Sequence, residues 1–212
     1  MSEKKGFLAM AKLGLILALY AAAASVGLAF VYAGTAEIIA QRQQADLDAA
    51  LLELFPDADS FNPIADIQSA DPTVIIEGDK ENPSNTGAFE AIKNNSTLGV
   101  ALRTSRASYS GPIKILVGVG TDGAIKGIKI LENTDTPGLG ANAGSKTYFV
   151  DRSRGIRFYD QFTGKSTRDP FEPKQDIAAI TAATITSTAV SASVKAAGIA
   201  AMEWMRNAGR QR

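Results

Sequence analysis

The sequence predicts an α+β protein with one N-terminal transmembrane helix, followed by a domain in which helices pack on a small antiparallel sheet. Three observations support this fold class. An uncharged apolar run extends from Leu13 to Ala36, two runs rich in Ile and Val flank an Asp-Gly pair at 122–123, and an alanine-rich segment with helical periodicity lies near the C-terminus.

The first element is a membrane span. The run from Leu13 to Ala36 would be about 36 Å long as a helix, which exceeds the roughly 30 Å hydrocarbon core of a bilayer. A cleaved signal peptide is the alternative, but the apolar run is about twice as long as the usual core of one. Lysines at 4, 5 and 12 precede the span, whereas Arg42 is the only Lys or Arg between 37 and 56. The positive-inside rule therefore predicts a cytoplasmic N-terminus, with residues 37–212 on the outer face.

The rest of the chain divides into a connector and a domain. Residues 37–55 have an amphipathic pattern that Pro56 closes, which predicts a helix leaving the membrane. Residues 56–88 are rich in turn formers and contain one possible strand at 74–77. We therefore expect an N-terminus and span over 1–36, an amphipathic helix and loop-rich connector over 37–88, and a folded domain over 89–212.

Within the domain, a hairpin is the strongest local signal. Residues 112–120 and 124–131 are apolar runs rich in Ile and Val that flank Thr-Asp-Gly at 121–123. An Asp-Gly pair between alternating apolar runs is a signature of a tight turn between two strands. A turn-rich segment at 133–145 and a mixed aromatic stretch at 148–162 follow. From about Thr188 the pattern becomes helical, with one apolar face formed by Val190, Val194, Ala197, Ala201 and Trp204.

Composition excludes several functions. The net charge is zero, with 22 basic and 22 acidic residues, so no nucleic-acid partner is expected. The chain has no cysteine and no histidine, hence no disulfide, no thiolate and none of the usual zinc, haem or iron–sulfur ligands. Without histidine it also lacks the usual general base for a serine or threonine nucleophile. Any redox function must therefore depend on an organic cofactor.

The loop Thr136-Pro137-Gly138-Leu139-Gly140 is one candidate binding site. Its glycines permit the backbone to approach another group closely, and Leu139 is an apolar side chain between two glycines. Such a tip suits contact with a flat ring, although an ordinary turn after a hairpin explains the same residues.

The second candidate is Ile-Thr-Ala-Ala-Thr-Ile-Thr-Ser-Thr at 180–188, directly before the predicted helix. Hydroxyl side chains cap helix N-termini, but five of them within nine positions also suggest a site for an anion such as phosphate. The residues by themselves leave both interpretations open.

Both stretches resemble motifs of a known family. Thr-Ala-Ala-Thr-Ile-Thr-Ser resembles the S/T-G-A-T-x-T-S flavinylation motif, and Asp-Thr-Pro-Gly-Leu-Gly resembles the E-T-P-G-L-G loop, of the membrane-anchored flavin subunits of Rnf and Na⁺-pumping NADH:quinone reductase complexes. Tyr109-Ser110-Gly111 also resembles the family's approach to that loop. The resemblance covers essentially the whole chain, and the short length favours the RnfG type over the NqrC type, which is the flavin subunit of the quinone reductase.

The resemblance implies that FMN is bound covalently, as a phosphoester made from FAD by a separate flavin transferase. The attached residue corresponds to Thr184, with Thr186 as the main rival. Thr181, Ala183, Thr186 and Ser187 would surround the phosphate or cap the helix, and Thr136, Pro137, Gly138, Leu139 and Gly140 would pack on the isoalloxazine edge. No catalytic residue and no metal site are implied.

Two positions depart from the family pattern. Ala182 replaces a glycine, which would strain the backbone if this position needs φ > 0. Asp135 replaces a glutamate. Asp176 corresponds to the acidic residue that precedes the motif, at a longer spacing than the family's.

The implied function is electron transport by a flavoprotein subunit of an ion-translocating ferredoxin:NAD⁺ oxidoreductase (Rnf) complex, a translocase of the bacterial inner membrane, with the flavin domain on the periplasmic face. Its partners would be a second flavin subunit and iron–sulfur membrane subunits. The alternatives are the NqrC-type subunit of the quinone reductase, or an anchored FMN-binding sensor outside such a complex. A non-redox assembly or adhesion module, in which the hydroxyl cluster only caps a helix, is a third possibility.

Overall fold

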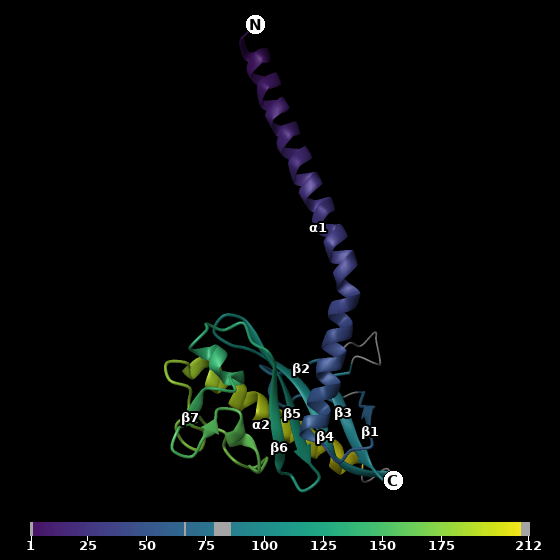
Figure 1. Cartoon of the computed structure of the whole chain (residues 1–212), viewed down its shortest axis with the longest axis vertical. Coiled ribbons are helices and arrows are strands. Elements are labelled where there is room, and N and C mark those ends of the chain that lie inside the picture. Colours follow the sequence, from purple (N-terminus) through teal and green to yellow (C-terminus); the bar gives the residue numbers. More distant parts are fainter. Residues whose placement is uncertain (1, 66, 79–85, 209–212) are drawn as a thin grey trace. The chain divides into compact units, whose positions relative to one another are not determined.

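The computed structural model describes residues 2–65, 67–78 and 86–208 and divides into two compact units, residues 1–47 and 48–212 (Figure 1). The first unit is helical throughout its described residues and belongs to α1, Ser2–Leu54. Alanine and leucine favour helix, and the segment has no proline before Pro56. The predicted helix over 37–55 is confirmed. From Leu13 to Tyr32 the large apolar side chains of α1 are exposed, as expected of a helix whose surroundings are lipid.

Among the residues that the structure describes, two helices are long and apolar enough to cross a membrane, one within α1 and one being α2, Thr184–Ala208. They differ in burial. In α1 none of the apolar window is buried, whereas 67% of the window in α2 is buried inside the protein. Helix α2 is therefore a core helix of the second unit, and α1 is the candidate membrane anchor.

The second unit contains a six-stranded antiparallel sheet of order β1-β3-β4-β5-β6, with β2 paired to β4. Its strands are β1 (Ser60–Pro63), β2 (Ile75–Ile76), β3 (Ala88–Lys93), β4 (Ser96–Ala107), β5 (Pro112–Gly120) and β6 (Ile125–Glu132). The predicted hairpin is confirmed as β5 and β6, and the possible strand at 74–77 as β2. Strands β1 and β2 join the main sheet, so part of the 56–88 segment is built into the domain.

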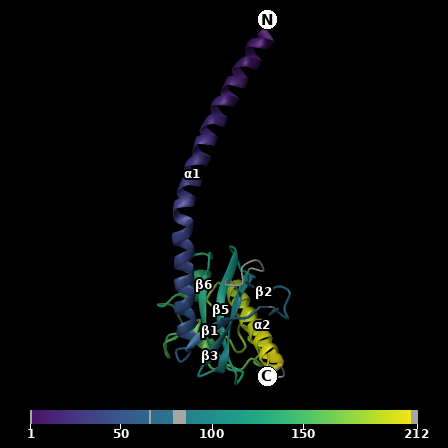
Figure 2. The same ribbon diagram turned by 90° about the vertical axis from the view of Figure 1, so that its right-hand side faces the viewer.

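The two faces of the sheet are covered by different helices (Figure 2). Val117 faces α2 and belongs to the main core, which also contains Val190 and Val194 of that helix. Its neighbour Gly118 points the other way, and a Cβ added there would lie 3.2 Å from the Leu54 side chain. The last turns of α1 therefore cover one face and α2 the other.

Short elements connect β6 to α2. They are the 3₁₀ helix η1 (Gly140–Gly144), the small hairpin β7 (Phe149–Asp151) and β8 (Ile156–Arg157), and the 3₁₀ helix η2 (Asp160–Phe162). Helix α2 then begins at Thr184, one turn before the predicted start near Thr188, which was wrong. Three β-branched residues at 184–186 weaken the local helical signal. The tertiary bond that Thr186 donates to Asp135 and the local bond that Ser187 Oγ accepts from Ile180 N compensate for it.

Candidate functional site

Asp135 joins three segments that are far apart in sequence. Its carboxylate, 4% exposed, accepts hydrogen bonds from Ser108 Oγ at 2.5 Å and Ser110 N at 2.8 Å, both in the turn between β4 and β5. It also accepts a bond from Thr186 Oγ1 in α2 at 2.6 Å. One buried side chain thus fixes the β4–β5 turn, the loop after β6 and the start of α2 together.

This carboxylate is ionised at neutral pH. Burial raises the pKa of Asp135, but hydrogen bonds from the Ser108 and Thr186 hydroxyls and from the backbone of Ser110 and Tyr109 lower it further, so the net pKa lies below the usual 3.8. The buried carboxylate is therefore an anion whose charge is stabilised by hydrogen bonds.

The loop after Asp135 is a tight turn that its sequence explains. Leu139 N donates to Thr136 O at 3.1 Å, with Pro137 and Gly138 at the two central positions. Gly138 has φ +78°, the left-handed conformation that the third residue of a type II turn requires. The turn is exposed from Thr136 to Leu139 and becomes buried at Gly140.

Gly140 lies directly against the start of α2. A Cβ added to it would be 2.4 Å from Thr186 Oγ1 and 2.6 Å from Asp135 Oδ2, so only glycine fits. The two candidate stretches, which are more than 40 residues apart in sequence, therefore meet at Gly140 and Thr186.

The hydroxyl residues at the start of α2 have different partners. Ser187 Oγ is fully buried; it accepts from Ile180 N at 3.0 Å and donates to Ala183 O at 2.9 Å, which joins the preceding turn to the first turn of the helix. Thr181 N donates to Tyr148 Oη at 3.1 Å. With Thr186 bonded to Asp135, these three hydroxyl residues all have protein partners.

Thr184 is different because it is exposed at the first residue of α2. The first backbone N–H groups of a helix have no partner within the helix and attract anions. The first turn of α2 contains no acidic residue that would repel one. A phosphate attached to the Thr184 hydroxyl would lie at this end of the helix.

Ala182 has a left-handed backbone, with φ +58°. The motif that this stretch resembles has glycine at the corresponding position, and the left-handed backbone explains why glycine would suit it, because an L side chain here is strained by about 1 kcal/mol or more. Ala182 is exposed. The expected cost of this departure is therefore confirmed as backbone strain rather than as a steric clash.

Replacing Ala182 by glycine is expected to stabilise the protein by about 1 kcal/mol, or about 2–4 °C in Tm, because the strain is relieved. Thermal unfolding of the full chain in detergent measures this. The matched control is Ala178→Gly, at an exposed loop alanine outside the positive-φ group, where greater chain entropy in the unfolded state should lower Tm. A lower Tm for Ala182→Gly would contradict the strain interpretation.

The structure places the predicted site residues in two groups. The exposed group consists of Thr136, Pro137, Gly138, Leu139, Thr181 and Thr184. The buried group, Gly140, Ala183, Thr186 and Ser187, holds the loop and the helix start in place. Sequence reasoning missed Tyr148, which bonds Thr181, and treated Asp135 only as a departure from the family. Both residues bond partners that are distant in sequence, so no local sequence pattern predicts their roles.

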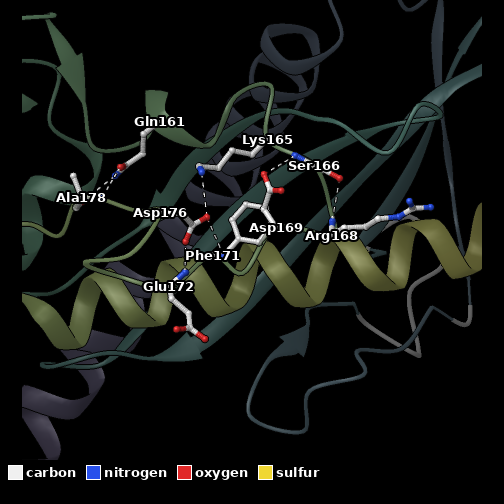
Figure 3. A network of polar contacts seen from close by, with 9 residues as sticks. All are labelled: Gln161, Lys165, Ser166, Arg168, Asp169, Phe171, Glu172, Asp176 and Ala178. Carbon is white, nitrogen blue, oxygen red and sulfur yellow. Dashed lines mark hydrogen bonds and ion pairs between the residues drawn. The ribbon is translucent and has the colours of Figure 1, made fainter.

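Asp176 has a structural role in the segment that leads to the site (Figure 3). Its carboxylate accepts bonds from Glu172 N at 2.7 Å, Lys165 Nζ at 3.1 Å and Phe171 N at 3.2 Å. Gln161 likewise pairs with both backbone groups of Ala178. Burial raises the pKa of Asp176, but the bond from Glu172 N and the Lys165 ammonium bring it below 3.8. These contacts shape the approach to Ile180 and α2.

Family models and sequence relatives indicate one family for this chain. Residues 108–198 match the model of the FMN-binding domain, and residues 1–54 match that of the RnfG N-terminal region. The chain is 32% identical to the G subunit of the Na(+)-translocating ferredoxin:NAD(+) oxidoreductase complex of Acetobacterium woodii, over 86% of this chain and 87% of the relative. It is 33% identical to the G subunit of the proton-translocating ferredoxin:NAD(+) oxidoreductase complex of Clostridium ljungdahlii, over 80% of each. The crystal structure of Shewanella oneidensis NqrC is similar with a TM-score of 0.47 and 15% identity, over 73% of this chain and 91% of that one.

Proposed function

Because the chain belongs to the RnfG family of ion-translocating oxidoreductase complexes, we propose that it is the membrane-anchored subunit that carries electrons through an FMN bound covalently to Thr184. The matched FMN-binding domain contains both candidate stretches and every residue bonded to Asp135. The shared family supports a ferredoxin:NAD⁺ oxidoreductase as the complex in which the subunit works.

One observation supports Thr184 as the attachment site: the difference in exposure between Thr184 and Thr186. Thr184 is exposed at the helix N-terminus, whereas Thr186 is 1% exposed and donates its hydroxyl proton to Asp135. A phosphoryl donor can reach the first hydroxyl in the folded domain, but it reaches the second only if the start of α2 unfolds. This favours Thr184 over its rival.

Attachment needs no histidine or cysteine of this chain. Thr184 would supply the oxygen to which the FMN phosphoryl group of FAD is transferred, with its hydroxyl proton released and AMP as the leaving group. The resulting phosphodiester would have one negative charge, which the N-terminal end of α2 would stabilise by about 0.3–1 kcal/mol. A flavin transferase would supply the catalytic groups that this chain lacks.

The site offers chemistry suited to FMN. Bound FMN supplies reversible electron transfer, which no side chain of this protein provides. The protein holds the phosphate near helix N–H groups and presents Leu139, 40% exposed, beside the exposed turn at 136–138. The described residues contain no cluster of acidic, histidine or cysteine side chains able to hold a metal ion.

The membrane span indicates how the protein contributes to the complex. The run from Leu13 to Ala36 contains no charged residue, so this span offers no group to carry an ion across the membrane. This chain is 32% identical to a relative named for Na⁺ translocation and 33% identical to one named for proton translocation. The lysines at 4, 5 and 12, which precede the span, favour a cytoplasmic N-terminus. We therefore propose a single-pass anchor with the flavin domain on the periplasmic face, relaying electrons between a partner's flavin and an iron–sulfur membrane subunit.

Intact mass under denaturing conditions tests the cofactor and its linkage together. Protein produced with its transferase should gain the mass of one FMN less water, and peptide mapping should locate it on Thr184. Protein produced without the transferase is the control and should have the mass of the unmodified chain. A flavin that dissociates on denaturation would contradict the covalent attachment.

A further inference from the structure

Strand β6 is the last strand of the sheet and, among the described strands, pairs only with β5 (Figure 1). Its other side is covered at the first residue, where Ile125 N donates to Lys165 O and Gly164 N donates to Ile125 O, both at 2.8 Å. No other backbone hydrogen bond reaches β6 from outside the sheet within the described part of the chain. The strand therefore has an open edge over 126–132, where a further strand could pair.

A groove of about 380 Å³ lies along this open edge. Five consecutive residues of β6, 126–130, line it. Alternate side chains of a strand point to opposite faces, so consecutive residues line one groove only along the edge of the strand. The other lining residues come from the end of α1 and from the segment 144–163. None belongs to the loop 136–140 or to the stretch 180–188, so this groove is not part of the proposed flavin site.

More cations than carboxylates line the groove. Its cations are Lys126, Lys129, Lys146 and Arg157, and its carboxylates are Glu53 and Asp160. Because the whole chain has a net charge of zero, this excess of positive charge is local.

Three of the four cations have one carboxylate partner each. Lys129 pairs with Glu53, Arg157 donates to Asp160 at 2.7 and 3.0 Å, and Lys126 pairs with Asp122 at 2.9 Å. Lys146 is exposed and has no ion pair among the described residues. An ammonium group has three donors and surface ion pairs are weak, so these lysines can bind further carboxylates.

We propose that the groove along β6 receives an acidic, extended segment of another subunit of the complex, whose carboxylates lie beside Lys126 and Lys146. Main-chain hydrogen bonds to the open strand edge supply affinity, and the excess of cations selects carboxylates. The relatives of this chain are subunits of multi-subunit complexes, which supplies the class of partner. The inference does not depend on the attachment of FMN to Thr184.

Carbodiimide cross-linking of the complex, purified in detergent, tests the contact because the reagent joins a lysine amine to a carboxylate that touches it. We expect peptide mapping to find Lys146 joined to an Asp or Glu of another subunit. Lys146→Arg keeps the charge but lacks the amine, so it should lose this cross-link and retain the other subunits. Lys195, exposed on α2, is the control lysine and should not be joined to the same segment. Cross-links from Lys146 only to carboxylates of its own chain, or none at all, would overturn the proposal.

Two substitutions test whether the groove holds the other subunit. Lys146→Glu reverses a charge without breaking an ion pair. Thr163→Trp fills the groove beside Gly127, because a Cβ added at Gly127 would lie 3.8 Å from Thr163 Oγ1. Each should reduce the amount of the other subunits recovered with this chain by about tenfold or more. The matched controls, Lys195→Glu and Thr163→Ala, should leave the recovery unchanged.

The mass of the attached flavin, measured on the same proteins, distinguishes this inference from the proposed function. All of these variants should retain FMN, because no substituted residue belongs to the flavin site. Full recovery of the other subunits with both Lys146→Glu and Thr163→Trp would overturn the docking proposal. The lysines and register shifts of β6 would then only protect the edge from aggregation. A wild-type chain without covalent flavin would instead overturn the proposed attachment and leave this inference standing.

Discussion

Replacing Thr184 by alanine is expected to remove all covalently bound flavin, because no other hydroxyl of the motif combines exposure with a place at the helix N-terminus. Thr186 is buried and bonded to Asp135, Ser187 is fully buried, and Thr181 lies before the helix. The purified variant should be colourless after denaturation and have the mass of the unmodified chain. Electron transfer through the protein should be lost with the flavin.

Two further variants make this result specific to position 184. Thr184→Ser keeps a hydroxyl at the same place and should retain flavin. Thr188→Ala removes an exposed hydroxyl one turn further along α2 and should leave flavinylation unchanged. A Thr184→Ala protein whose flavin maps to Thr186 would show that the start of α2 unfolds during modification, and the exposure argument would then fail.

Replacing Gly140 by alanine should destabilise the domain more than any other single substitution proposed for this site. The added Cβ would lie within 2.7 Å of three atoms of Thr186 and Asp135, and both side chains are buried and held by hydrogen bonds. Overpacking costs about 1–3 kcal/mol, and breaking the bond between them adds about 1–3 kcal/mol. At a total of about 3 kcal/mol, the expected fall in Tm is about 6–12 °C.

Gly138→Ala is the comparison that distinguishes the cost of a steric clash from the cost of a strained backbone conformation. Nothing lies within 4 Å of a Cβ at Gly138, so its cost arises only from φ +78° and should be about 1 kcal/mol. Thermal unfolding of the full chain measures both variants. Equal Tm values for the two would contradict the tight contact at Gly140.

Local patterns predicted much of the fold. The Asp-Gly hairpin, the strand near Val74 and the helix that ends at Leu54 all depend on periodicity and turn residues, and the structure confirms them. The β3–β4 hairpin was missed. Its signal was the pair Asn94-Asn95, with φ of +50° and +63°, which forms the two-residue turn that favours asparagine. Strand β1 includes Pro63 and pairs at the edge of the sheet, where no local pattern distinguishes it from a loop.

Residue types and their order determined an uncharged span, a chain without cysteine or histidine, a Pro-Gly turn and a cluster of hydroxyls before a helix. These local features indicated an organic cofactor for any redox function and allowed an anion site at the helix start. The flavin itself was implied by the resemblance of two motifs to those of a known family.

How the hydroxyls divide their tasks depends instead on the packing of distant segments. Thr184 and Thr186 are alike in the sequence, but the helix turns by about 100° per residue, so two residues further on the side chain points to the interior. There it meets Asp135, which is 51 residues earlier in the chain and has no local relation to it. Packing thus buries one threonine as a structural donor and leaves the other exposed at the helix N-terminus.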